Sequence, residues 1–120
     1  MRDHTLTLVI MADFGMGPYA WLRYPDEPPY KCGGNIADSV CGFPEEYGIS
    51  KELEKLFAEW VIDFERHYDQ PVFNWQEWND SGIVLAKKLK VEVGDKFSVE
   101  YHVPMEDPSN PNGDRIIKIA

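Results

Sequence analysis

The sequence predicts an α+β fold in which two helices pack on one face of a small antiparallel sheet. Two observations carry this prediction. Apolar residues recur at helical spacing in two long segments near the middle of the chain, and the segments on either side alternate or are β-branched, as strands are. The expected strands cover residues 5–14, 96–103 and 115–120.

The first predicted element is the strand TLTLVIMADF, residues 5–14. Its β-branched and apolar residues place Leu6, Leu8 and Ile10 on one face, which is typical of a buried or central strand. The following segment, residues 14–34, holds four prolines and four glycines, too many breakers for a helix. Only residues 19–24 within it suggest a short second strand.

Residues 36–49 are expected to form at most one helical turn, because Gly42, Pro44 and Gly48 interrupt them. An amphipathic helix of about 17 residues is then predicted between Ser50, a favourable N-cap, and Asp69. Its apolar stripe is formed by Leu53, Leu56, Phe57, Trp60, Val61, Phe64 and Tyr68. Helical spacing brings these side chains to one face, so Trp60 is expected in the core.

A second helix is predicted from Trp75 to Leu89, with Asn74 and Glu77 at the positions of a capping box. Trp78 is expected in the core, and Gly82 is expected to permit close approach of the first helix. The strand at residues 96–103 alternates, so that Ser98, Glu100 and His102 are expected on a half-exposed face. After a loop with a turn at Asn112–Gly113, residues 115–120 form the last strand.

The composition describes one globular domain, residues 1–120, with 43% hydrophobic residues and a net charge of −9. The charge is uneven: residues 1–80 hold 15 acids and 6 bases, whereas the remainder holds 6 of each. Phosphates would be repelled, so nucleic acid is not expected as a partner. A basic protein would be attracted, and its association would be accelerated.

Three acids of the first helix, Glu52, Glu59 and Asp63, fall within about 40° of one another at 100° per residue. They form a column beside the apolar stripe, although Glu59 and Asp63 repel each other at a spacing of four. Two interpretations stay open: a solvated face that keeps the protein soluble, and an anionic docking face. For the docking face we expect additional aromatic contacts from Tyr19, Trp21 and Tyr24.

The sequence contains no motif that indicates a catalytic or metal-binding site. Cys32, Asp38 and His67 have no spacing that suggests a catalytic triad, and GMGPYA lacks the pattern of a phosphate-binding loop. We therefore expect no enzyme, no cofactor and no metal. No apolar run is long enough to span a membrane, and the N-terminus does not look like a signal peptide, so a cytoplasmic location with free thiols at Cys32 and Cys41 is expected.

The segment FNWQEWNDSGIVLAKKLKVEVGDKFSVEYHVPMEDP, residues 73–108, resembles small bacterial immunity proteins encoded beside polymorphic or contact-dependent toxins. The resemblance rests on a W-x-x-W helix start, the helix end LAKKLK, and the strand VEYHVPMEDP with its exit, and it covers under a third of the chain. It implies a cytoplasmic, non-enzymatic protein that binds a cognate toxin domain and blocks its active site or substrate surface. Many such toxins are nucleases with basic clefts.

Three functions therefore remain. The first is an immunity protein that neutralises a basic, nuclease-type toxin domain by occlusion. The second is an acidic DNA mimic or regulatory protein that binds a nucleic-acid-binding host protein. The third is a small ligand-binding module or enzyme with a pocket near Trp21 and Cys32, which a deep pocket with converging polar groups would favour.

Overall fold

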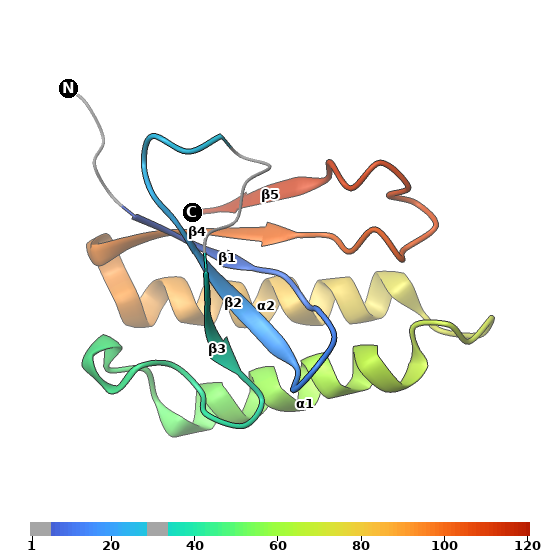
Figure 1. Cartoon of the computed structure of the whole chain (residues 1–120), viewed down its shortest axis with the longest axis horizontal. Coiled ribbons are helices and arrows are strands. Elements are labelled where there is room, and N and C mark those ends of the chain that lie inside the picture. The colour runs from blue at the N-terminus through green and yellow to red at the C-terminus, as the bar shows by residue number, and fades with distance from the viewer. Residues whose placement is uncertain (1–5, 29–33) are drawn as a thin grey trace.

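Within residues 6–28 and 34–120, which the computed structural model describes, five strands form one sheet and two long helices cover one of its faces (Figure 1). The strands are β1 (Leu6–Ile10), β2 (Pro18–Arg23), β3 (Asn35–Asp38), β4 (Phe97–His102) and β5 (Ile116–Ile119). The helices are α1 (Lys51–His67) and α2 (Trp75–Val93), and short 3₁₀ turns are η1 (Glu45–Tyr47) and η2 (Gly94–Lys96). The predicted α+β class, with both helices on one face, is confirmed.

The strand order is β3-β2-β1-β4-β5, which places β1 at the centre as its apolar sequence predicts. Three of the four strand pairs are antiparallel, but β1 and β4 are parallel. Parallel neighbours need a long crossover connection, and here the chain passes through both helices between β1 and β4. The residue pattern of a strand does not reveal its direction, so this pair was not predictable from alternation.

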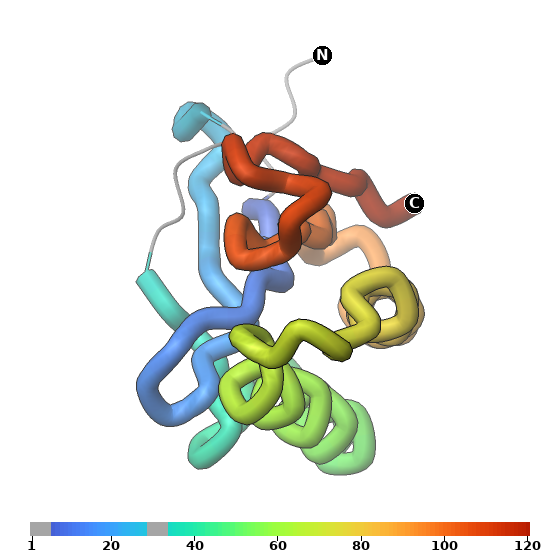
Figure 2. The backbone as a smooth tube through the Cα atoms, turned by 90° about the vertical axis from the view of Figure 1, so that its right-hand side faces the viewer, coloured from blue at the N-terminus to red at the C-terminus, as the bar shows by residue number. Residues whose placement is uncertain are grey.

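The helix-facing side of the sheet carries the core. Leu8 lies between Leu22 on β2 and Val99 on β4, and Ile10 lies next to Tyr101. These side chains pack with the apolar stripes of both helices in one cluster. In Figure 2, a view turned by 90°, α1 and α2 are seen nearly end-on and lie next to each other on one side of the strands. The molecule therefore has two layers.

Helix α1 forms as predicted. The Ser50 side chain accepts a hydrogen bond from the backbone N–H of Leu53 at 3.2 Å, and the helix ends at His67. Trp60 and Phe64 are buried, and Leu56 is half-buried. The helical periodicity of the apolar residues thus identified the buried face.

Helix α2 begins as predicted and ends later than predicted. The Asn74 side chain accepts a hydrogen bond from the backbone N–H of Glu77 at 3.0 Å. The helix continues four residues beyond the predicted end, to Val93, which is buried. At this end Lys90 Nζ donates to the carbonyl oxygens of Gly94 and Phe97 at 2.8 and 2.9 Å, which satisfies backbone groups of the terminus.

Two tryptophans join the helices. The rings of Trp60 and Trp78 stack with centroids 4.4 Å apart and planes 6° apart. Each indole N–H donates to the backbone carbonyl of the other residue, at 3.1 and 2.9 Å. Beside them, a Cβ on Gly82 would lie 2.7 Å from Trp60 Cζ2 and 2.6 Å from Tyr101 Cε1. Gly82 therefore permits the close approach that its position in the sequence suggested.

The segment between β1 and α1 is more regular than predicted. β3 was expected to lie in irregular chain, but it pairs antiparallel with β2, and the Asn35 side chain donates to the carbonyl oxygens of Ala20 and Ala37 at 2.9 and 2.8 Å. Register shifts between Pro18 and Trp21 hide this strand from simple alternation. Cys41 is exposed with a free thiol, whereas the expectation for Cys32 lies outside the described residues.

Candidate partner-binding groove

The predicted acid column lies on the solvent-facing side of α1. Glu52, Glu59 and Asp63 are all exposed. Among residues 6–28 and 34–120, neither Glu52 nor Glu59 has an ion-pair partner within 4.0 Å. Asp63 Oδ1 lies 2.9 Å from Nδ1 of His67, one turn later. The two glutamates are therefore free to bind a cationic group.

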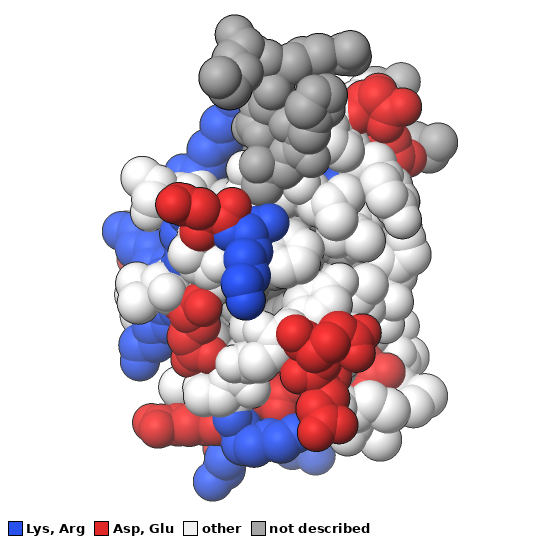
Figure 3. All heavy atoms as spheres, turned by 90° about the vertical axis from the view of Figure 1, so that its left-hand side faces the viewer, with Lys and Arg blue, Asp and Glu red and all other residues white. Residues whose placement is uncertain are grey.

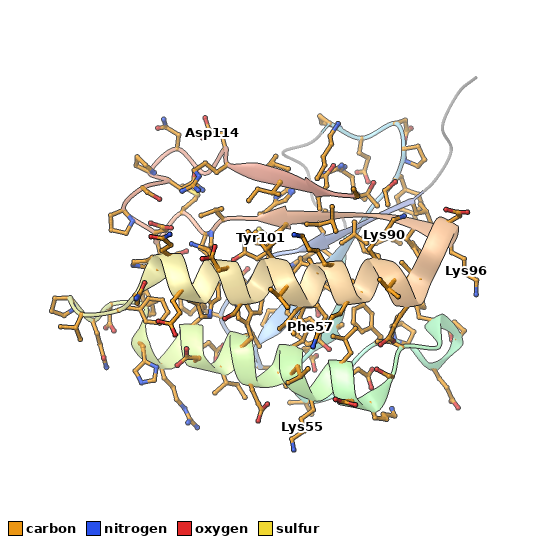
Figure 4. The ribbon with its side chains drawn as sticks, turned by 180° about the vertical axis from the view of Figure 1, so that it is seen from behind. Lys55, Phe57, Lys90, Lys96, Tyr101 and Asp114 are labelled. Carbon is orange, nitrogen blue, oxygen red and sulfur yellow. The ribbon has the colours of Figure 1, made fainter. Side chains whose placement is uncertain are left out.

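A groove of about 1170 Å³ lies between the outer sides of α1 and α2. Its floor includes Leu56, Trp60, Trp78 and Leu85, which continue the interhelical core to the surface. In Figure 4, seen from behind, the helices lie side by side in front of the sheet, so this groove faces the viewer. The sequence predicted one wall of it but could not show which part of α2 lies opposite.

The groove is strongly acidic. Carboxylates line it on both helices: Glu59, Asp63, Glu77 and Asp80. Lys88 is its only Lys or Arg lining residue among the described residues. Lys55 of α1 projects away from α2 (Figure 4). A cationic side chain in the groove would therefore be attracted by four carboxylates and repelled by one ammonium.

A second hollow of about 310 Å³ continues the groove toward the start of α1. It shares Leu56 and Lys88 with the larger hollow and is also lined by Glu52 and Val91. All three predicted acids therefore line this continuous depression. We use the term interhelical groove for both hollows together.

Exposed valines accompany the acids on the α2 side. Val84 lines the larger hollow and is 50% exposed, and Val91 lines the smaller one and is 83% exposed. Val72, in the connection between the helices, is 85% exposed at the other end of the groove. Isolated exposed apolar residues are common, but these three lie along one depression. The interhelical groove thus offers apolar contacts as well as negative charge.

The predicted aromatic contacts do not join this site. Tyr19 is fully buried in the core and stacks on Phe57 with centroids 4.9 Å apart, so its assignment to partner binding is corrected. Trp21 pairs with Val9 and shares the face of the sheet opposite the helices, where its indole N–H donates to Met11 O at 3.0 Å. Tyr24 is 54% exposed just beyond β2.

A buried ionic cluster lies on the same helix-free face of the sheet. Arg23 makes a bidentate pair with Glu100 at 2.9 and 2.7 Å, and Nε2 of His102 lies 3.3 Å from Glu100. All three residues are 7% exposed, so the prediction of a half-exposed face on this strand is wrong at Glu100 and His102. Ser98, at the start of the strand, is half-buried as expected. An arginine and a glutamate distant in sequence gave no signal of this pairing.

Burial and charge act in opposite directions on this cluster. Burial alone would raise the pKa of Glu100, but hydrogen bonds from Arg23 and His102 and their charges outweigh it and lower that pKa. Burial lowers the pKa of His102, because a buried cation is poorly solvated, although Glu100 acts against the shift. His102 is therefore neutral in the folded protein near pH 7.

A polar hollow of about 430 Å³ lies between α2 and the loop before β5. Next to it Tyr101 Oη donates to Asn79 Oδ1 at 2.5 Å, and Asn79 Nδ2 donates to Asp107 Oδ2 at 2.9 Å. The other carboxylate oxygen of Asp107 accepts from the backbone N–H and the hydroxyl of Ser109. These polar groups already bond one another and fasten the loop to α2, so they do not converge on the empty space.

The charges at the end of the molecule formed by the start of α1 and the end of α2 are mixed. Figure 3 shows acidic and basic patches side by side on this end. The interhelical groove differs from it, because its acids outnumber its single lysine. Net charge alone therefore does not define the candidate site.

In the described ranges no three histidine, cysteine or acidic side chains gather where they could hold a metal ion. No helix in that part of the chain is long and apolar enough to cross a membrane. Comparison with models of protein families, with curated proteins and with solved structures gives no match.

Proposed function

We propose that this protein is an immunity-type binding inhibitor that neutralises a basic toxin domain by covering its active site or substrate surface. The observation that carries the proposal is the interhelical groove, in which Glu59, Asp63, Glu77 and Asp80 face a single lysine. The toxin class comes from the resemblance of residues 73–108 to immunity proteins, and the groove supplies a surface on which a basic protein would bind.

Steered association suits this role. An inhibitor must reach its toxin before the toxin acts, and opposite charges raise association rates well above those of neutral surfaces. The groove also offers what charge alone does not, because the apolar floor and the exposed valines can exclude water from the ion pairs. A small-molecule site is less well supported, since the polar atoms beside the other hollow bond one another.

The proposal is tested by a binding titration with the product of the neighbouring gene, which the proposal expects to carry the toxin domain. The variant changes Glu52, Glu59 and Asp63 to lysine, and its association rate should fall while the salt dependence of that rate becomes flatter. Growth of cells that express the toxin should be rescued by the wild-type protein and poorly by the variant.

A second triple variant separates position from net charge. Glu45, Glu46 and Asp95 are exposed acids outside the interhelical groove, and their replacement by lysine changes the net charge by the same amount. This control should retain most of the wild-type association rate and the rescue. Equal losses in both variants would show that only total charge matters, and no binding by the wild-type protein would refute the proposed partner.

A further inference from the structure

We propose, on the basis of the function above, that the interhelical groove receives one α-helix of the partner. This helix is amphipathic, with basic residues toward α1 and apolar residues toward the valines of α2. Three features of the groove carry this inference: its length, the spacing of the groups on its two walls, and their chemical difference.

The groove follows the helices for most of their length. Its lining begins at residues 70–74, in the connection between α1 and α2, and reaches Ser50 and Val91 at the opposite end. Helix α1 has 17 residues, which corresponds to about 25 Å at 1.5 Å per residue. A rod of that length fits such a depression, whereas a small ligand would occupy a fraction of it.

The spacing on the walls favours a helix over an extended segment. Glu52 and Glu59 are seven residues apart on α1, and Val84 and Val91 are seven residues apart on α2. Seven residues of helix rise about 10.5 Å. A helix with a heptad repeat presents matching side chains at the same interval, whereas a strand presents them about every 6.6 Å.

Both walls carry acids near the start of α2, where Glu77 and Asp80 line the groove. Further along they differ, because α2 presents Val84 and Val91 on either side of Lys88. This difference defines the orientation of the guest helix. The glutamates of α1 are exposed and have no ion-pair partner in the described part of the chain. The valines of α2 are exposed with apolar floor residues beside them. The same acids argue against a second copy of this protein, because two acidic walls would repel each other.

The inference is tested with synthetic peptides of about 18 residues, long enough for about 27 Å of helix. One peptide places lysines and leucines on two sides of a heptad helix. A second has the same composition in an alternating order that suits a strand, and a third replaces each lysine by glutamate. Binding is measured by calorimetry, and induced helicity by circular dichroism.

The heptad peptide should bind with a gain of helicity and at least about tenfold more tightly than either control peptide, a difference of ~1.4 kcal/mol. Replacement of Val84 and Val91 by serine should weaken this binding by about the same factor, and so should replacement of Glu52 and Glu59 by glutamine. The control variants Val40→Ser and Glu45→Gln change exposed residues outside the groove and should bind as the wild-type protein does.

The inference would be overturned if the heptad peptide showed no saturable binding or bound no more tightly than the alternating peptide. It would also be overturned if the groove variants bound the heptad peptide as tightly as the wild-type protein does. These failures differ from failure of the proposed function. If the toxin domain binds through the acids but the heptad and alternating peptides bind equally well, only the guest helix is refuted. Selective helix binding without toxin binding would support the groove and refute the toxin as its partner.

Discussion

Replacement of Gly82 by alanine sets two effects of known size against each other. In an exposed helix this change would stabilise the protein by about 1 kcal/mol, because alanine has the higher helix propensity. Here the new Cβ would lie 2.6 Å from a ring carbon of Tyr101 and 2.7 Å from a ring carbon of Trp60. Both distances are well below ordinary van der Waals contact.

Neither ring can move away freely. Trp60 is stacked on Trp78 and donates its indole N–H to the Trp78 carbonyl, while the Tyr101 hydroxyl donates to Asn79. Overpacking of a core costs about 1–3 kcal/mol, and a strained hydrogen bond adds up to about 1 kcal/mol. After the gain in propensity is subtracted, we therefore expect Gly82→Ala to lower the free energy of unfolding by up to about 3 kcal/mol.

Urea denaturation followed by far-ultraviolet circular dichroism measures this free energy. Ser81→Ala is the matched control, because Ser81 is exposed on the same helix and its replacement brings only the propensity gain. The reasoning would be refuted if Gly82→Ala were as stable as the Ser81 variant or more stable than the wild-type protein. The helices would then be further apart than the structure places them.

Three further outcomes are expected from the core and the ionic cluster. Trp60→Ala should lower the free energy of unfolding by about 3–5 kcal/mol, and a thermal melt without loss would contradict its core position. Tyr19→Phe should leave stability unchanged or raise it by about 1 kcal/mol, because the buried hydroxyl has no hydrogen-bond partner in the described structure; a clear loss in urea denaturation would contradict this. Stability measured in urea should decline as the pH falls below 6.5, because the unfolded chain protonates His102 before the folded protein does. It should decline again below 4.5, where the unfolded chain protonates Glu100 first. His102→Gln should remove the first decline, and a flat pH profile of the wild-type protein would refute this prediction.

The elements governed by local periodicity were predictable. Ser50 and Asn74 cap helices where their sequence context indicates, and the apolar stripe of α1 identifies its buried face. The central position of β1 followed from its continuous apolar character. Each of these properties depends on residues a few positions apart, which is the range over which sequence patterns are informative.

Features that depend on distant pairing were not predictable. The strand β3 is short and irregularly paired, and Arg23 and Glu100 resemble solvent-facing charges until the sheet brings them together. For the same reason, only half of the candidate site could be predicted from the sequence. The acid column of α1 followed from helical geometry, but Glu77 and Asp80 join it only because α2 packs beside α1.

The parallel pair of β1 and β4 also has a consequence for synthesis of the protein. Leu6 pairs with Phe97, so the centre of the sheet closes a loop that contains most of the chain. Closing so long a loop costs entropy before any contact is gained, and folding rates fall as such distant contacts dominate. A nascent chain that ends before Phe97 leaves the apolar strand β1 with an open edge. The centre of the sheet therefore forms only after Phe97 has been synthesised, and shorter chains expose an aggregation-prone strand.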